Sequence, residues 1–125
     1  MKKYSPKILS AAKNIKLIAT DIDGVLTSGE VIILEKGEEI KIWNVKDGAG
    51  IAYIKKYLPE VKIAWISGRC SKQVQIRSKE LKIDYLFQSC GDKVKAVSEI
   101  ASKLNIDMSN VAYIGDDIID IGVLK

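Results

Sequence analysis

Short apolar segments that favour β-strands alternate along this chain with segments of helical periodicity. The expected strands are rich in β-branched and aromatic residues and cover residues 16–20, 61–66, 84–88 and 111–114. The clearest helix lies before the last of them, with apolar residues on a 3.6-residue period at Val94, Val97, Ala101 and Leu104. Apolar strands alternating with amphipathic helices predict an α/β fold with a Rossmann-like, doubly wound parallel sheet.

A β-hairpin is expected directly after the first strand, because two strand-like segments, 30–34 and 39–45, flank the loop 35–38. Both faces of this hairpin are apolar, and a two-stranded ribbon is marginal alone, so we expect its surfaces to pack against other chains. Asp47 is expected to cap the next helix, which carries Ile51, Ile54 and Leu58 on one face. Ser71 and Asp92 are expected to cap the two helices that follow, the first of which reaches about Leu81.

Length and composition fit one domain spanning residues 1–125 and exclude several classes of site. The chain has no histidine, which removes zinc sites and catalytic dyads that need imidazole. Its net charge of +4 comes without a dense basic stripe, so we expect no nucleic acid partner. Two cysteines without CxxC spacing indicate reduced thiols, and no apolar run approaches membrane-spanning length. We therefore expect a cytoplasmic protein without a membrane partner.

Polar residues follow three of the expected strands at the point where each strand ends. They are Asp21 and Asp23, Ser67 and Arg69, and Asp116 and Asp117. The carboxyl ends of parallel strands meet at one edge of the sheet, where ligands bind, so these side chains should gather there. Crowded carboxylates need a cation, and a set of oxygen donors without histidine favours a hard divalent ion such as Mg²⁺.

A Mg²⁺ site beside a serine hydroxyl and a lysine suits a phosphoryl group, because the cations neutralise its charge and the hydroxyl binds its oxygens. Without a histidine base, a carboxylate is the most plausible nucleophile. A second carboxylate two residues along the same loop can exchange protons with the leaving oxygen. The sequence thus predicts phosphoryl transfer at this edge.

Four motifs in order resemble the haloacid dehalogenase-like phosphatases. Motif I is similar to Asp21-Ile22-Asp23-Gly24-Val25-Leu26-Thr27, and motif II to Ser67 within Ile66-Ser67-Gly68-Arg69. Motif III is similar to Lys93 in Gly91-Asp92-Lys93, and motif IV to Gly115-Asp116-Asp117 with Asp120. Each stands at an expected strand end or helix start, and together they span nearly the whole chain.

The resemblance implies a role for each of these residues. Asp21 would attack phosphorus to form an aspartyl-phosphate, and Asp23 would protonate the leaving alcohol and then activate water. Mg²⁺ would be held by the carboxylates of Asp21 and Asp116 and by the backbone carbonyl of Asp23. Phosphate and substrate would be bound by Ser67, Gly68, Arg69 and Lys93, while Asp117 and Asp120 would act through water or orient Lys93.

No cap domain fits between these motifs, since the first gap holds only the hairpin at about residues 29–45. This arrangement resembles the 3-deoxy-manno-octulosonate 8-phosphate (KDO 8-phosphate) phosphatase group, in which such hairpins assemble a homotetramer. The segments Trp43–Ile51 and Ser67-Gly68-Arg69 carry that likeness. It implies a sugar acid phosphate as substrate, and Arg69 favours the eight-carbon KDO 8-phosphate over nine-carbon 9-phosphates.

Several alternatives stay open at this point. Lys46 and Asp47 are either substrate contacts or a helix cap and its neighbour, and Asp120 is either a solvated helix residue or a group behind the metal. A signalling receiver domain also has a doubly wound sheet, but its acidic pair would follow the first strand rather than the last. A catalytically idle assembly module of the same fold is the third hypothesis. Relatives of this group continue past motif IV, so we expect the C-terminal part of the fold to be missing here and the motif IV strand to lie at a sheet edge.

Overall fold

Four parallel strands form the central sheet of the computed structural model, which describes residues 4–125. They are β1 (Leu17–Thr20), β4 (Lys62–Ile66), β5 (Tyr85–Phe87) and β6 (Val111–Ile114), in the order β5-β4-β1-β6. In this register Thr20 pairs with both Trp65 and Ile114, so the strands β1, β4 and β6 end side by side. The predicted parallel α/β sheet is confirmed, and β6 lies at its edge within the described chain.

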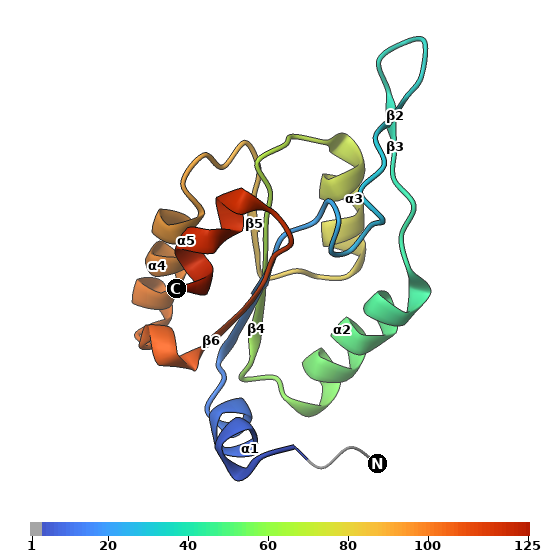
Figure 1. Ribbon diagram of the computed structural model, residues 1–125. Helices are drawn as coiled ribbons and strands as arrows, with labels where there is room; N and C mark the ends of the chain where they lie inside the picture. The colour runs from blue at the N-terminus through green and yellow to red at the C-terminus, as the bar shows by residue number, and fades with distance from the viewer. Residues whose placement is uncertain (1–3) are drawn as a thin grey trace.

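Helices cover both faces of this sheet (Figure 1). On one face, α2 (Val45–Tyr57) and α3 (Lys72–Glu80) pack on a core of Ile22, Ile51, Ile63, Trp65 and Val74. On the other, α4 (Lys93–Leu104) and α5 (Ile121–Leu124) cover a core of Leu17, Ala19, Ala64, Ile66, Ala96, Val97 and Ile100. Alternate residues of β1 and β4 point to opposite faces, which explains why their sequences are apolar apart from Thr20 and Lys62 at their ends. None of the described helices has both the length and the apolar character needed to cross a membrane.

The hairpin is present after β1, but its paired strands are much shorter than expected. Only β2 (Ile32–Ile33) pairs with β3 (Glu39–Ile40), in antiparallel register. Residues 31–38 are all exposed, and the hairpin projects from the body of the molecule (Figure 1). Its second arm leaves the ladder early because Trp43 stacks on Trp65 of β4 at 5.6 Å between ring centroids, which draws the chain back to the sheet.

Two details of the helices differ from expectation. The first turn of α2 is capped by Asn44, whose side chain accepts a hydrogen bond from the Lys46 amide at 2.9 Å, so the prediction that Asp47 caps it is wrong. Ser71 precedes α3 as expected, yet its side chain makes no capping bond, whereas Asp92 caps α4 through the Lys95 amide.

An additional helix, α1 (Pro6–Lys13), lies before β1 and was not expected from the sequence. Its N-cap is Ser5 and its first residue is a proline, which together are a recognisable helix-start signal. Two short 3₁₀ helices, Met108–Asn110 and Ile118–Asp120, flank β6. The second carries the polypeptide from motif IV into α5.

Candidate active site

The structure gathers Asp21, Lys93 and Asp120 into one buried cluster at the carboxyl ends of β1 and β6. Asp21 directly follows β1, and its Oδ2 lies 2.9 Å from Lys93 Nζ at the start of α4. The same Nζ donates to Asp120 Oδ1 at 2.7 Å. Lys93 is 3% exposed and Asp120 is 0% exposed. Of the two alternatives for Asp120, the solvated helix residue is therefore excluded.

Asp120 is held by more groups than any other carboxylate described. It accepts hydrogen bonds from Lys93, from the Tyr113 hydroxyl and, through Oδ2, from the Asp116 and Asp117 amides at 3.1 Å each. Gly115 leaves room for it, because a Cβ at that position would lie 2.4 Å from the Asp120 carboxyl carbon. These bonds fix Asp120 as a rigid support for the Lys93 ammonium.

The protonation of this cluster follows from its burial and its partners. Burial raises the pKa of Asp21, an effect that the bonds from Lys93 and the Ile22 amide only partly offset. Burial also opposes the charges of Lys93 and Asp120, but their mutual hydrogen bond and their further partners outweigh it, so the pKa of Lys93 is raised and that of Asp120 is lowered. Burial and, to a smaller extent, the hydrogen bond to Asp120 raise the pKa of Tyr113. Lys93 is therefore a fixed positive charge beside Asp21.

Oxygen atoms of Asp21, Asp116 and Asp120 lie within 4.8 Å of one another, which makes this cluster a fit for a divalent cation. All three are carboxylates, the hard donors that Mg²⁺ prefers. Asp116 is exposed, and the loop after β1 approaches it so closely that a Cβ on Gly24 would lie 1.8 Å from Asp116 Oδ2. Gly24 has φ +91°, so both its backbone conformation and its lack of a side chain suit this approach.

Ser67 and Arg69 follow β4 on the same edge of the sheet. Ser67 is 2% exposed, its amide donates to the Phe87 carbonyl at 2.9 Å, and its Oγ accepts from the Arg69 amide at 3.1 Å. Gly68 between them is exposed, and so is Arg69, whose guanidinium reaches Glu39 Oε1 at 3.4 Å. The loop therefore presents one buried hydroxyl and one exposed cation at the rim of the site.

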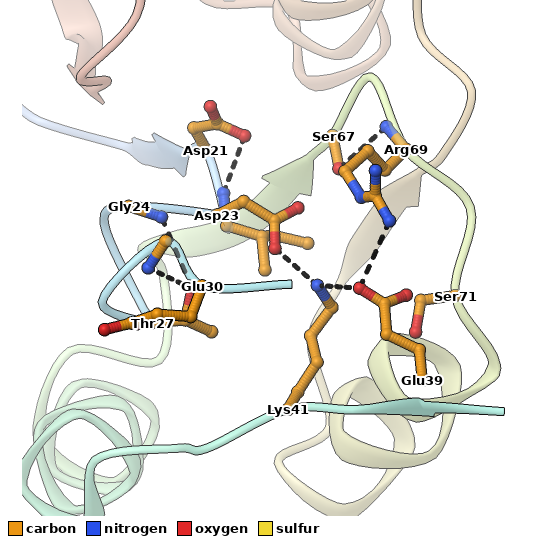
Figure 2. Close-up of polar contacts among 12 residues, drawn as sticks. Asp21, Asp23, Gly24, Thr27, Glu30, Glu39, Lys41, Ser67, Arg69 and Ser71 are labelled. Atoms are coloured by element: carbon orange, nitrogen blue, oxygen red, sulfur yellow. Dashed lines mark hydrogen bonds and ion pairs between the residues drawn. The ribbon is translucent and has the colours of Figure 1, made fainter. Parts of the chain in front are cut away.

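Asp23 turns away from the Asp21 cluster and pairs with Lys41 of the hairpin (Figure 2). Lys41 Nζ also donates to Glu39 Oε1 at 2.8 Å. Burial opposes the charge of Lys41, but its hydrogen bonds to Asp23 and Glu39 outweigh this effect and raise the pKa of Lys41. The Lys41 ammonium and, to a smaller extent, Arg69 lower the pKa of Glu39. The sequence reasoning missed Lys41, Glu39 and Tyr113 as residues of this region.

Some residues singled out from the sequence are not brought into the cluster. Lys46 is exposed in the first turn of α2, and Asp47 lines a cleft of about 540 Å³ between the loop after β1 and the start of α2. Asp117 is exposed and accepts from the Ile118 amide at 2.6 Å, which caps the following 3₁₀ helix. None of these three makes a polar contact with Asp21 or Lys93 among the described residues.

Comparison with known proteins gives a consistent set of relatives. Residues 32–125 match the family model of haloacid dehalogenase-like hydrolases. The 3-deoxy-D-manno-octulosonate 8-phosphate phosphatase of Salmonella typhimurium is 40% identical over 121 residues, and that of Escherichia coli K12 is equally similar. These alignments cover 97% of this chain and 63% of each relative, so the chain spans less than two thirds of the length of the curated relatives it matches.

Solved structures show the same likeness. The Moraxella catarrhalis 3-deoxy-D-manno-octulosonate 8-phosphate phosphatase, solved with magnesium, phosphate and KDO, superposes with a TM-score of 0.89 at 39% identity, over 95% of this chain and 67% of that one. The cobalt-bound Haemophilus influenzae deoxy-D-mannose-octulosonate 8-phosphate phosphatase gives 0.82 at 34% identity, over 89% and 64%.

Proposed function

The chain belongs to the haloacid dehalogenase-like hydrolases, as a phosphatase related to the KDO 8-phosphate phosphatases, and we propose that it hydrolyses KDO 8-phosphate to KDO and phosphate with Mg²⁺. One observation carries the proposal. The buried Asp21 carboxylate stands 2.9 Å from a fixed lysine charge and within 4.8 Å of oxygens of Asp116 and Asp120. That combination would supply a nucleophile, a cation to neutralise the phosphate and a metal-binding edge together.

In the proposed reaction, an Asp21 carboxylate oxygen attacks phosphorus while the bond from phosphorus to the sugar oxygen breaks. Asp23 gives its proton to that leaving oxygen. Water then attacks the phosphorus of the aspartyl-phosphate and gives a proton to Asp23, and the bond from phosphorus to Asp21 breaks. Phosphate leaves, and both carboxyl groups return to their starting states.

The surrounding residues would bind and orient the phosphoryl group. Lys93, held by Asp120, would pair with its oxygens, and the Ser67 hydroxyl would donate to them. Mg²⁺ would be held by Asp21, Asp116 and the Asp23 carbonyl and would supply positive charge for the phosphoryl oxygens. The phosphate-bound and magnesium-bound Moraxella relative supports this assignment.

The homotetramer expected from the hairpin belongs to this proposal. Val31, Ile32, Ile33, Leu34, Ile40 and Ile42 are each at least 40% exposed, so the described chain offers an apolar surface that further copies would cover. The cytoplasmic location expected from the cysteine usage is likewise kept as a prediction.

The test is phosphate release from a panel of substrates with Mg²⁺, comparing KDO 8-phosphate with the nine-carbon KDN and N-acylneuraminate 9-phosphates. The proposal expects a higher kcat/KM for KDO 8-phosphate. A preference for a nine-carbon substrate would overturn the choice based on Arg69. An absence of phosphate release from every member would favour a catalytically idle assembly module.

A further inference from the structure

A buried lysine reaches the site from the hairpin rather than from the sheet. The Lys41 side chain is only 2% exposed, although it belongs to a segment whose other residues are largely exposed. Lysine is almost never this buried unless it is paired. Its ammonium lies between the carboxylates of Asp23 and Glu39 (Figure 2).

These contacts form a chain of alternating charge across three segments. Asp23 from the loop after β1 pairs with Lys41, Lys41 with Glu39 of β3 at 2.8 Å, and Glu39 with Arg69 of the loop after β4 at 3.4 Å. With two cations and two carboxylates, this set of four side chains carries no net charge. Glu39 and Lys41 are two residues apart, so both side chains point to the same face of the extended arm, toward the site.

The placement of Lys41 matters because Asp23 has few other restraints. The hydrogen bonds of the loop after β1 fix Asp21 and Gly24 through the Ile22 amide and Thr27 Oγ1, but the Asp23 carboxylate has Lys41 as its side-chain partner. A general acid must stand within hydrogen-bond reach of the leaving oxygen, and a misplacement of about 1 Å can cost about 10²-fold in rate.

We propose that Lys41 is a positioning residue that holds the Asp23 carboxyl group in place for proton transfer: once protonated from solvent, Asp23 gives that proton to the leaving oxygen. This inference rests on the proposed phosphatase function. It makes the hairpin part of the catalytic arrangement within one chain, in addition to any role in assembly. Glu39 and Arg69 complete the arrangement by fixing the Lys41 ammonium from the other side.

The dependence on the leaving group separates this role from a structural one. A sugar alkoxide needs a proton as its bond to phosphorus breaks, whereas p-nitrophenolate is stable without one. A misplaced Asp23 should therefore slow formation of the aspartyl-phosphate, which kcat/KM reports, far more with KDO 8-phosphate than with p-nitrophenyl phosphate. The later water step, in which Asp23 also takes part, is common to both substrates and does not enter kcat/KM. A fault in Asp21, the metal site or the fold would slow both substrates alike.

The experiment measures kcat and KM for both substrates with Mg²⁺ in the wild-type chain, Lys41→Met and Lys41→Arg. We expect Lys41→Met to lower kcat/KM on KDO 8-phosphate at least about tenfold more than on p-nitrophenyl phosphate, within the contribution of about 10²–10⁴ that general acids make. Lys41→Arg should recover part of the loss, because it keeps the charge. Lys55→Met is the matched control, since Lys55 pairs with Asp84 at 3.0 Å outside the site, and it should leave the ratio unchanged.

Equal losses of kcat/KM on both substrates would overturn the inference while leaving the proposed function intact. If Lys41→Met does not fold by circular dichroism, Lys41→Gln replaces it with the same expected ratio. A wild-type chain that releases phosphate from neither substrate would overturn the proposed function, and this inference with it.

Discussion

Replacing Asp120 with alanine should destabilise the fold strongly, because it removes a fully buried partner of the Lys93 charge. Lys93 would lose its 2.7 Å contact but keep Asp21 at 2.9 Å, so the loss lies at the lower end of the cost of breaking a buried pair, about 3 kcal/mol. The Tyr113 hydroxyl would lose its acceptor, which adds about 1 kcal/mol. The expected fall in the free energy of unfolding is therefore about 4 kcal/mol.

Urea unfolding followed by circular dichroism, with EDTA present, measures this change. With a slope of about 2 kcal/mol/M, the midpoint should fall by about 2 M. Asp117→Ala is the matched control, because that neighbouring carboxylate is exposed and only caps a 3₁₀ helix, so it should cost about 1 kcal/mol. A similar, small midpoint shift for both variants would refute the assignment of Asp120 as a buried support.

A double-mutant cycle isolates the pair itself. Lys93→Met should cost about 2–3 kcal/mol less in the Asp120→Ala background than in the wild-type chain, because the Lys93–Asp120 ion pair is already broken there. Additive effects would show that the two residues stabilise the fold independently, against the geometry described above.

Further predictions concern the loop after β1, the hairpin charges and the hairpin surface. Gly24→Ala should lower phosphate release more than about tenfold, because the added Cβ would lie 1.8 Å from Asp116 Oδ2 and displace that side chain. Gly37→Ala, also at positive φ but with nothing within 4 Å of the added Cβ, should have no such effect. Equal activities of the two variants would contradict this prediction. Since the pKa of Glu39 is lowered from 4.5, chiefly by its bond from Lys41, its carboxylate stabilises the fold above about pH 4.5 and that stability is lost as pH falls further. The difference in urea midpoint between wild type and Glu39→Gln should thus shrink on acidification, and a constant difference would argue against the ion pair. Ile33→Glu, at a 63% exposed position of the hairpin, should lower the molar mass measured by light scattering if the hairpin assembles copies; an unchanged mass would place the interface elsewhere.

The sequence was sufficient to predict the strands and the ends that carry polar residues, because apolar strands buried on both faces leave a strong pattern. It also singled out Lys93, through the likeness of Gly91-Asp92-Lys93 to motif III, and Lys93 is buried. Lys41 could not be found in this way. It lies between Ile40 and Ile42, an alternation that is typical of a solvent-facing lysine on a half-buried strand, and the return of the chain through the Trp43–Trp65 stack brings it to Asp23.

The start of α2 shows the same limit. Asn44 and Asp47 are both good capping residues, so local propensity does not choose between them, and the packing of Trp43 on Trp65 decides the outcome. Similarly, an aspartate two residues before a glycine is an ordinary surface residue in sequence terms. Asp120 is buried because Lys93 of α4, the Tyr113 hydroxyl and the amides of Asp116 and Asp117 surround its carboxylate.

The most direct test of the central claim is to trap the phosphorylated intermediate and locate it. The wild-type chain is mixed with KDO 8-phosphate and Mg²⁺, quenched, and treated with borohydride, which reduces an aspartyl-phosphate to homoserine. Peptide mass spectrometry should then find homoserine at residue 21 in the wild-type chain and not in Asp21→Asn. Phosphate release with no modification at Asp21, or with modification at another carboxylate such as Asp23 or Asp116, would contradict the account.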